Sequence, residues 1–195
     1  MIHSLEPAIG FCCVQLPSAT GYTYTLTTLL GKFLDEAEQR FGERDRSYTP
    51  LGIEFCGNTP MVWYPCNRRH ASIMLTDSAR TDPAQAIFQL AHEVVHLLAP
   101  TGRYETVVFE EGLATLFSNE MAEKHGSLMR ADRPDYLDAA DLVRRFLTQY
   151  PDGVRAIRAQ QPSFNKFTLD IVCRICPEIP KWLAEAMCLP FRASQ

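Results

Sequence analysis

The chain has 195 residues, of which 46% are hydrophobic and 22% are charged, and its formal net charge at pH 7 is −4. This size and hydrophobic content are enough to bury a real core, most simply as one domain over residues 1–195. The negative charge, without a run of Lys and Arg, argues against direct binding of nucleic acid, which usually shows as a basic patch. No apolar stretch approaches the length of about 18 residues that a membrane-spanning helix needs.

The first part of the chain predicts a strand, a helix and three short extended runs. Residues 8–16 indicate the strand, and apolar residues at helical spacing predict an amphipathic helix over 26–41, ended by Gly42. The extended runs cover residues 51–56, 61–64 and 72–76. Because the run at 72–76 lies directly before the next helix, its edge is our candidate for binding an extended peptide by strand addition. The alternative is an interior strand with no free edge.

The next helix carries the most informative motif, His92-Glu93-Val94-Val95-His96. Asp82 is placed to cap this helix and Pro83 to begin it, and Pro100 ends it. Apolar residues spread over every face between these points, which predicts a buried helix.

Two histidines four residues apart point the same way on a helix and can bind one metal ion. Glu93 lies close enough to take a proton from a metal-bound water. A polar cluster on a buried helix is costly unless a metal satisfies it. The alternative is that both histidines sit on an ordinary helix and never meet a metal.

A hydrolytic zinc site needs a third protein ligand. A second helix is predicted from Phe109, with a stop at Gly126, and the short link lets it fold back on the first helix. Glu110 and Glu111 point about 100° apart on such a helix, so only one of them can face the metal well. Glu111 shares its face with small residues that allow close helix packing, so we expect Glu111 to be the ligand. Glu110 would then orient a histidine or lie at the surface.

These motifs resemble those of known zinc metallopeptidases. H-E-x-x-H followed by a Glu on the next helix is similar to the gluzincin arrangement, and the closer likeness is to the ImmA/IrrE metallopeptidase family. Phe88–Glu93 matches that family's F-x-L-A-H-E, and Glu111–Ser118 matches its E-x-x-A-x-x-F-small pattern. The similarity covers about a quarter of the chain, roughly Ser72 to Glu123.

The predicted fold class is α+β: a small zincin-like β-sheet with an active-site helix, followed by a mostly helical C-terminal part. Residues 1–126 would form the catalytic core and residues 127–195 a helical subdomain. The later helices are expected over residues 136–150, 152–160, 163–176 and 180–189. We expect them to be structural support; a lid over the site and a docking surface are the alternatives.

The motif and the resemblance predict a metal-dependent hydrolase that cleaves peptide bonds. One zinc ion per chain is expected on His92, His96 and Glu111, with manganese or iron compatible with the same ligands, and Glu93 is the expected general base. The expected partner is a protein or peptide substrate, with regulatory proteins among the candidates. Two alternatives stay open: a regulatory binding module on the same fold with little turnover, and a metal hydrolase acting on another kind of substrate.

The developing negative charge on the substrate oxygen needs a further donor. Tyr104 is the sequence candidate for this role, followed by Arg103 and His125, and each has a surface or structural role as its alternative.

The N-terminus has neither a basic start nor a long apolar run, so no signal peptide is expected and the predicted location is the cytoplasm. The seven cysteines are then expected to be reduced, buried apolar residues. Cys173 and Cys176 have the spacing of a metal or redox site but no second pair, which disfavours a structural zinc there.

Overall fold

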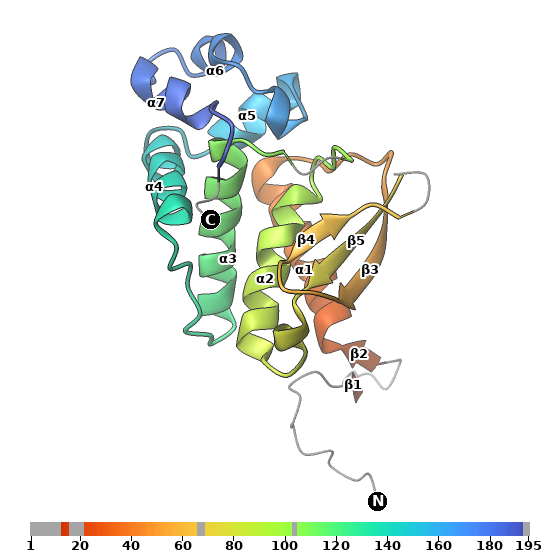
Figure 1. Ribbon diagram of the computed structural model, residues 1–195. Helices are drawn as coiled ribbons and strands as arrows, with labels where there is room; N and C mark the ends of the chain where they lie inside the picture. The colour runs from red at the N-terminus through yellow and green to blue at the C-terminus, as the bar shows by residue number, and fades with distance from the viewer. Residues whose placement is uncertain (1–12, 16–21, 66–68, 103–104, 193–195) are drawn as a thin grey trace, which may run out of the picture.

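The structure is a computed structural model that describes residues 13–15, 22–65, 69–102 and 105–192. Its architecture is a small mixed sheet beside a set of helices, so the predicted α+β class is confirmed (Figure 1). A separate antiparallel pair is formed by β1 (Cys13–Gln15) and β2 (Tyr22–Tyr24). Within the described ranges, no helix is both long and apolar enough to cross a membrane.

The main sheet has the order β3-β5-β4, formed by β3 (Thr49–Phe55), β5 (His70–Leu75) and β4 (Met61–Trp63). β5 runs parallel to β3 and antiparallel to β4. The peptide-binding edge predicted at residues 72–76 is therefore wrong, because this strand is the central one, and the interior alternative is confirmed. The local sequence does not encode strand order, which depends on pairing between distant segments. In the described part of the chain β4 pairs only with β5 and is an edge strand.

Helix α2 (Pro83–His96) begins where its capping signals predict. The Asp82 side chain accepts a hydrogen bond from the backbone N–H of Gln85 at 3.1 Å, and Pro83 occupies the first turn. A 3₁₀ turn, η1 (Asp77–Arg80), joins this helix to β5. The buried Gln89 side chain accepts a hydrogen bond from the Thr76 backbone N–H at 3.0 Å, which fixes α2 against the end of β5.

Figure 1 shows α2 lying between the sheet and α3 (Val108–Lys124), with α4 (Pro134–Gln149) on the far side of α3. Helix α1 (Thr25–Phe41) packs against α2 and contacts β3. Gly112 allows α3 and α4 to approach closely, because a Cβ at this position would lie 2.3 Å from the Ala139 backbone oxygen. Gly112 directly follows Glu111, so this close approach also fixes the position of Glu111 relative to α4.

The C-terminal part is helical, as predicted. It contains α5 (Gly153–Gln160), η2 (Phe164–Lys166), α6 (Leu169–Ile175) and α7 (Lys181–Met187). The single helix predicted over 163–176 is wrong, because the chain forms η2, leaves the helical conformation and restarts at α6. Thr168 causes the restart, since its side chain caps α6 by accepting from the Ile171 N–H at 3.3 Å.

Candidate metal centre

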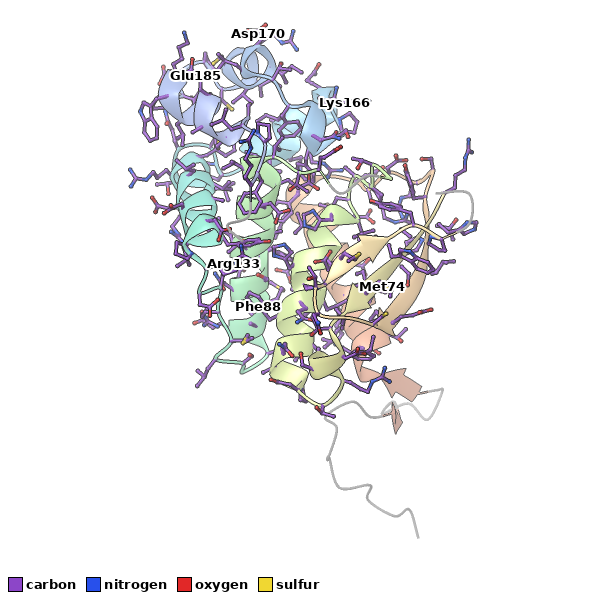
Figure 2. The ribbon with its side chains drawn as sticks, in the orientation of Figure 1. Met74, Phe88, Arg133, Lys166, Asp170 and Glu185 are labelled. Carbon is purple, nitrogen blue, oxygen red and sulfur yellow. The ribbon has the colours of Figure 1, made fainter. Side chains whose placement is uncertain are left out.

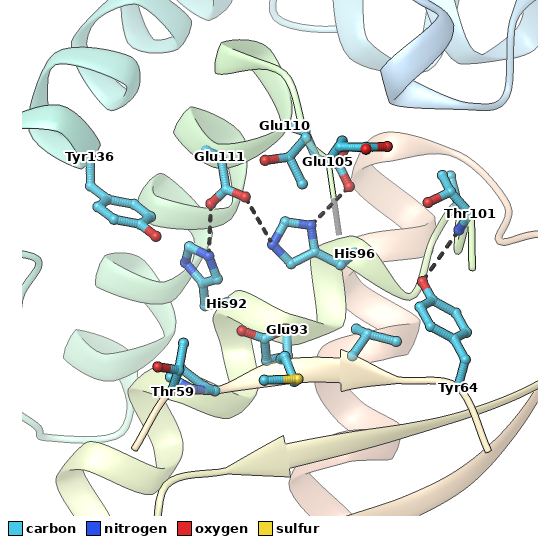
Figure 3. Close-up of a pocket in the computed structure, with 15 residues that line it drawn as sticks. Thr59, Tyr64, His92, Glu93, His96, Thr101, Glu105, Glu110, Glu111 and Tyr136 are labelled. Carbon is cyan, nitrogen blue, oxygen red and sulfur yellow. Dashed lines mark hydrogen bonds and ion pairs between the residues drawn. The ribbon is translucent and has the colours of Figure 1, made fainter. Parts of the chain in front are cut away.

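Three of the four predicted site residues come together between α2 and α3. The candidate ligand atoms of His92, His96 and Glu111 all lie within 4.8 Å of one another. The Nε2 atom of His92 lies 3.2 Å from one oxygen of Glu111, and the Nε2 atom of His96 lies 3.7 Å from the other (Figure 3). Both imidazoles therefore turn the same kind of nitrogen toward one carboxylate. Their role as metal ligands stays a prediction.

Glu110 contacts the opposite side of the His96 ring. Its carboxylate lies 2.8 Å from the Nδ1 atom, and because an ionised carboxylate can only accept, the ring donates this hydrogen bond. In the neutral ring this bond keeps the proton on Nδ1 and leaves the lone pair on the Nε2 atom that faces Glu111, which is the tautomer a metal ligand needs. Glu110 thus lies outside the group of candidate ligands. Its contact with His96 suits a residue that orients a histidine, which is one of the two roles that the sequence analysis gave it.

The fourth predicted residue, Glu93, is buried beside this group, with 3% of its surface exposed. Burial raises the pKa of its carboxyl group, while the neighbouring His96 and His92 lower it less strongly. A raised pKa suits a group that accepts and returns a proton near neutral pH.

Glu111 is also buried and His96 is largely buried, and each favours the charged form of the other. Burial opposes ionisation of Glu111, yet His96 and His92 outweigh it and lower the pKa of this carboxyl to about 2. Burial also disfavours the His96 cation, but Glu111 and Glu110 raise the pKa of His96 to about 10. The buried Glu111 carboxylate thus stays ionised beside a cationic imidazole, so this space stabilises positive charge, as a cation site must.

A cavity of about 280 Å³ opens onto these groups. Its walls come from α2, from the start of α3, from Tyr136 at the start of α4 and from the edge strand β4 with its flanking residues (Figure 3). Met61 and Val62 of β4 line the cavity, and Tyr64 follows them, with its hydroxyl accepting a hydrogen bond from the Thr101 N–H at 3.3 Å. An extended ligand lying along β4 would cross His92 and Glu93.

A second cavity of about 340 Å³ continues from the first on the other side of His92 and Glu93. Thr59, Pro60 and Tyr136 also line both cavities, so the two are adjacent at the candidate centre, and together we call them the cleft. Phe88 and Arg133, which Figure 2 labels, line the second part.

Tyr136 is the main site residue that sequence reasoning missed. Its ring lies edge-on to His92, with 5.8 Å between the ring centroids, and its hydroxyl points into the cleft beside Glu111 (Figure 3). Burial and the charge of Glu111 raise the pKa of Tyr136 to about 12, so the phenol stays protonated and can donate a hydrogen bond. No local signal marks this residue, because its position depends on how α4 packs on α3.

The sequence suggested three other residues as donors to the substrate oxygen. Tyr104 and Arg103 lie outside the described residues. His125 is wrong for this role, because it lies at the opposite end of α3 from Glu111 and its ring packs against Phe33 at 5.3 Å. Among the described residues, Cys173 and Cys176 belong to no group with metal-binding geometry.

Comparison of the sequence with protein-family models finds no match, and searches of curated proteins and of solved structures find none either. The likeness to gluzincins and to the ImmA/IrrE family therefore depends on the residues of the two motifs alone.

Proposed function

We propose that this protein is a metal-dependent hydrolase that cleaves peptide bonds. The observation that carries the proposal is the convergence of His92, His96 and Glu111 within 4.8 Å on a cleft that Glu93 also lines. This set matches the two-histidine, one-glutamate ligands of catalytic zinc sites, which leave a position open for water. The motif resemblance to the ImmA/IrrE family supports the same activity.

The donor set fits one divalent cation. Glu93, Glu110 and Glu111 are all buried, with 3%, 4% and 6% of their surfaces exposed, and they line one cavity together with the imidazoles of His92 and His96. In this structure the His96 cation balances the Glu111 carboxylate, and a divalent ion on the same atoms would replace that proton and balance the carboxylate in its place. The mixed nitrogen and oxygen donors favour zinc and also suit manganese or iron.

When bound, the metal would polarise the scissile carbonyl and make a coordinated water acidic. Glu93 would accept the proton of that water and pass it to the leaving amine, as its buried carboxyl with a raised pKa permits. The Tyr136 hydroxyl would donate a hydrogen bond to the carbonyl oxygen as negative charge develops there. Glu110 would keep the His96 ring in the required tautomer.

The shape of the cleft supports a peptide substrate. β4 is an edge strand whose residues line the cleft, so an extended chain could pair with it and pass over Glu93. The edge strand that lines the cleft is thus β4 (Met61–Trp63) rather than the strand that the sequence suggested.

We further propose that the protein acts in the cytoplasm, on a protein or peptide and without contacting nucleic acid itself. Cys56, Cys173, Cys176 and Cys188 have free thiols in the structure, which suits a reducing compartment. The net charge of −4 disfavours a nucleic-acid surface.

The deciding experiment compares the wild-type chain with Glu93→Gln. Metal content is measured by elemental analysis, and hydrolysis is measured on a peptide library by mass spectrometry. Glu93→Gln should keep about one zinc per chain and lose roughly 10² to 10⁴ of the hydrolysis rate, because only the base is removed. Unchanged cleavage by Glu93→Gln would disprove the mechanism. A wild-type chain that binds zinc but cleaves no peptide would favour the regulatory alternative.

A further inference from the structure

The last described segment of the chain lies against the candidate centre. Residues Leu189–Phe191, which we call the C-terminal strap, run antiparallel to Thr106–Val108 at the start of α3. The Val108 N–H donates to the Leu189 carbonyl at 2.9 Å, and the Phe191 N–H donates to the Thr106 carbonyl at 2.9 Å. Val107 and Pro190 form an isolated antiparallel bridge between these two bonds. The strap therefore fixes the backbone that immediately precedes Glu110 and Glu111.

One side of this contact reaches Glu111. Thr106 lines the same cavity as Glu111, and its hydroxyl is close enough to the Glu111 carboxylate to help lower the pKa of that group. Because the strap holds the Thr106 carbonyl, it limits how far the Thr106 hydroxyl can move away from Glu111.

The other side of the contact reaches His92. The Phe191 ring packs on Tyr136 with 4.9 Å between the ring centroids, and the Tyr136 ring in turn lies edge-on to His92 at 5.8 Å. Neither Phe191 nor Tyr136 belongs to the set of candidate ligands, yet together they close one side of the His92 ring.

These contacts form a closed path around the candidate centre, from Glu111 through Thr106, Phe191 and Tyr136 to His92. We propose that the C-terminal strap positions the metal centre from both sides, with Thr106 and Phe191 as positioning residues. This inference depends on the metal site of the proposed function, but not on the reaction or on the substrate. It gives residues near the end of the described chain a role at a site whose motif lies nearly a hundred residues earlier.

The test uses full-length variants with metal ions alone as the probe. Zinc affinity is measured by competition with a chromophoric chelator, and ligand geometry by the visible absorption of the Co²⁺ complex. Thr106→Val should lower zinc affinity by about tenfold, as loss of a group that orients a ligand typically does, whereas Thr106→Ser should keep it. Phe191→Ala, one contact further out, should lower the affinity roughly threefold and shift the Co²⁺ bands, and Phe191→Tyr should restore both.

Leu189→Ala is the matched control, because this side chain is 57% exposed while its carbonyl would still hold the Val108 N–H. It should behave as the wild type. Wild-type affinity and spectrum in Phe191→Ala would overturn the inference, and so would equal losses in Leu189→Ala and Phe191→Ala. If circular dichroism shows that Phe191→Ala does not fold, Phe191→Leu carries the same comparison. A wild-type chain that takes up neither zinc nor Co²⁺ would instead overturn the proposed function.

Discussion

Glu110 and Glu111 are neighbours in sequence but contact opposite sides of the His96 ring. Glu111 faces the Nε2 atoms of both histidines, whereas Glu110 binds the Nδ1 atom of His96. This is possible because adjacent helical residues diverge by about 100°, and the imidazole lies between the two directions. Removing Glu111 should therefore affect zinc binding differently from removing Glu110.

Glu111→Ala should abolish stoichiometric zinc binding, because one of three candidate ligands is lost. Glu110→Ala should keep about one zinc per chain and weaken the affinity by roughly 10-fold to 100-fold, because only the orientation of His96 is lost. Elemental analysis gives the stoichiometry and chelator competition gives the affinity. Loss of zinc from Glu110→Ala with retention in Glu111→Ala would reverse the assignment.

Tyr136→Phe separates the hydroxyl of Tyr136 from its ring. The ring contacts with His92 and Phe191 should remain, so zinc affinity should stay within about twofold of the wild type. The rate of peptide hydrolysis at saturating substrate should fall by roughly 10² to 10³, the usual cost of one donor to a developing oxyanion. A full rate in Tyr136→Phe would assign that role to another group.

At the scale of elements, local signals determined what could be predicted. The start of α2 follows from Asp82 and Pro83, and the relation of His92 to His96 follows from helical spacing alone. The order of the strands does not follow from local patterns, and it places β5 in the centre of the sheet, with β3 and β4 at the edges. The place of Tyr136 was equally hidden, since it depends on the packing of α4 against α3 at Gly112.

The packing at Gly112 gives a sharp prediction. A Cβ there would meet the backbone of Ala139 at 2.3 Å, and backbone cannot move aside as a flexible side chain can. Gly112→Ala should therefore lower the free energy of unfolding by about 1 to 3 kcal/mol, despite the better helix propensity of alanine. It should also weaken zinc binding, because the adjacent Glu111 would shift with α3.

Gly31→Ala is the control for this prediction, because Gly31 lies in α1 with nothing within 4 Å of the added Cβ. This substitution should raise the free energy of unfolding by roughly 0.5 to 1 kcal/mol. Urea denaturation of both variants measures the difference. A Gly112→Ala protein as stable as the wild type would contradict the close approach of α3 and α4.

At the scale of the whole molecule, one buried cation links the C-terminal helices to two earlier parts of the chain. Arg158 of α5 has 4% of its surface exposed, and its guanidinium also lies 5.1 Å from the centroid of the Phe164 ring. It donates hydrogen bonds to backbone carbonyls at and just after the end of α1, after α2 and after α5, namely those of Phe41, Gly42, Glu43, Leu98 and Pro162. These carbonyls lie at or just beyond helix ends, where the helical pattern leaves acceptors unfilled, and that of Leu98 also accepts from the Asp45 N–H. One side chain thus joins the helix that carries the H-E-x-x-H motif to the C-terminal part.

Arg158→Ala should lower the free energy of unfolding by about 3 kcal/mol or more, because it leaves several carbonyls without a donor. Burial lowers the pKa of Arg158 to about 10, so the native side chain is still charged at neutral pH. Arg158→Lys should also destabilise the fold, since an ammonium has three donors and lacks the planar fork that reaches separate carbonyls. Arg155→Ala, on the exposed face of the same helix, should stay within about 0.5 kcal/mol of the wild type. Urea denaturation followed by circular dichroism measures these differences, and equal stabilities of Arg158→Ala and Arg155→Ala would show that the C-terminal helices are held in place by other contacts.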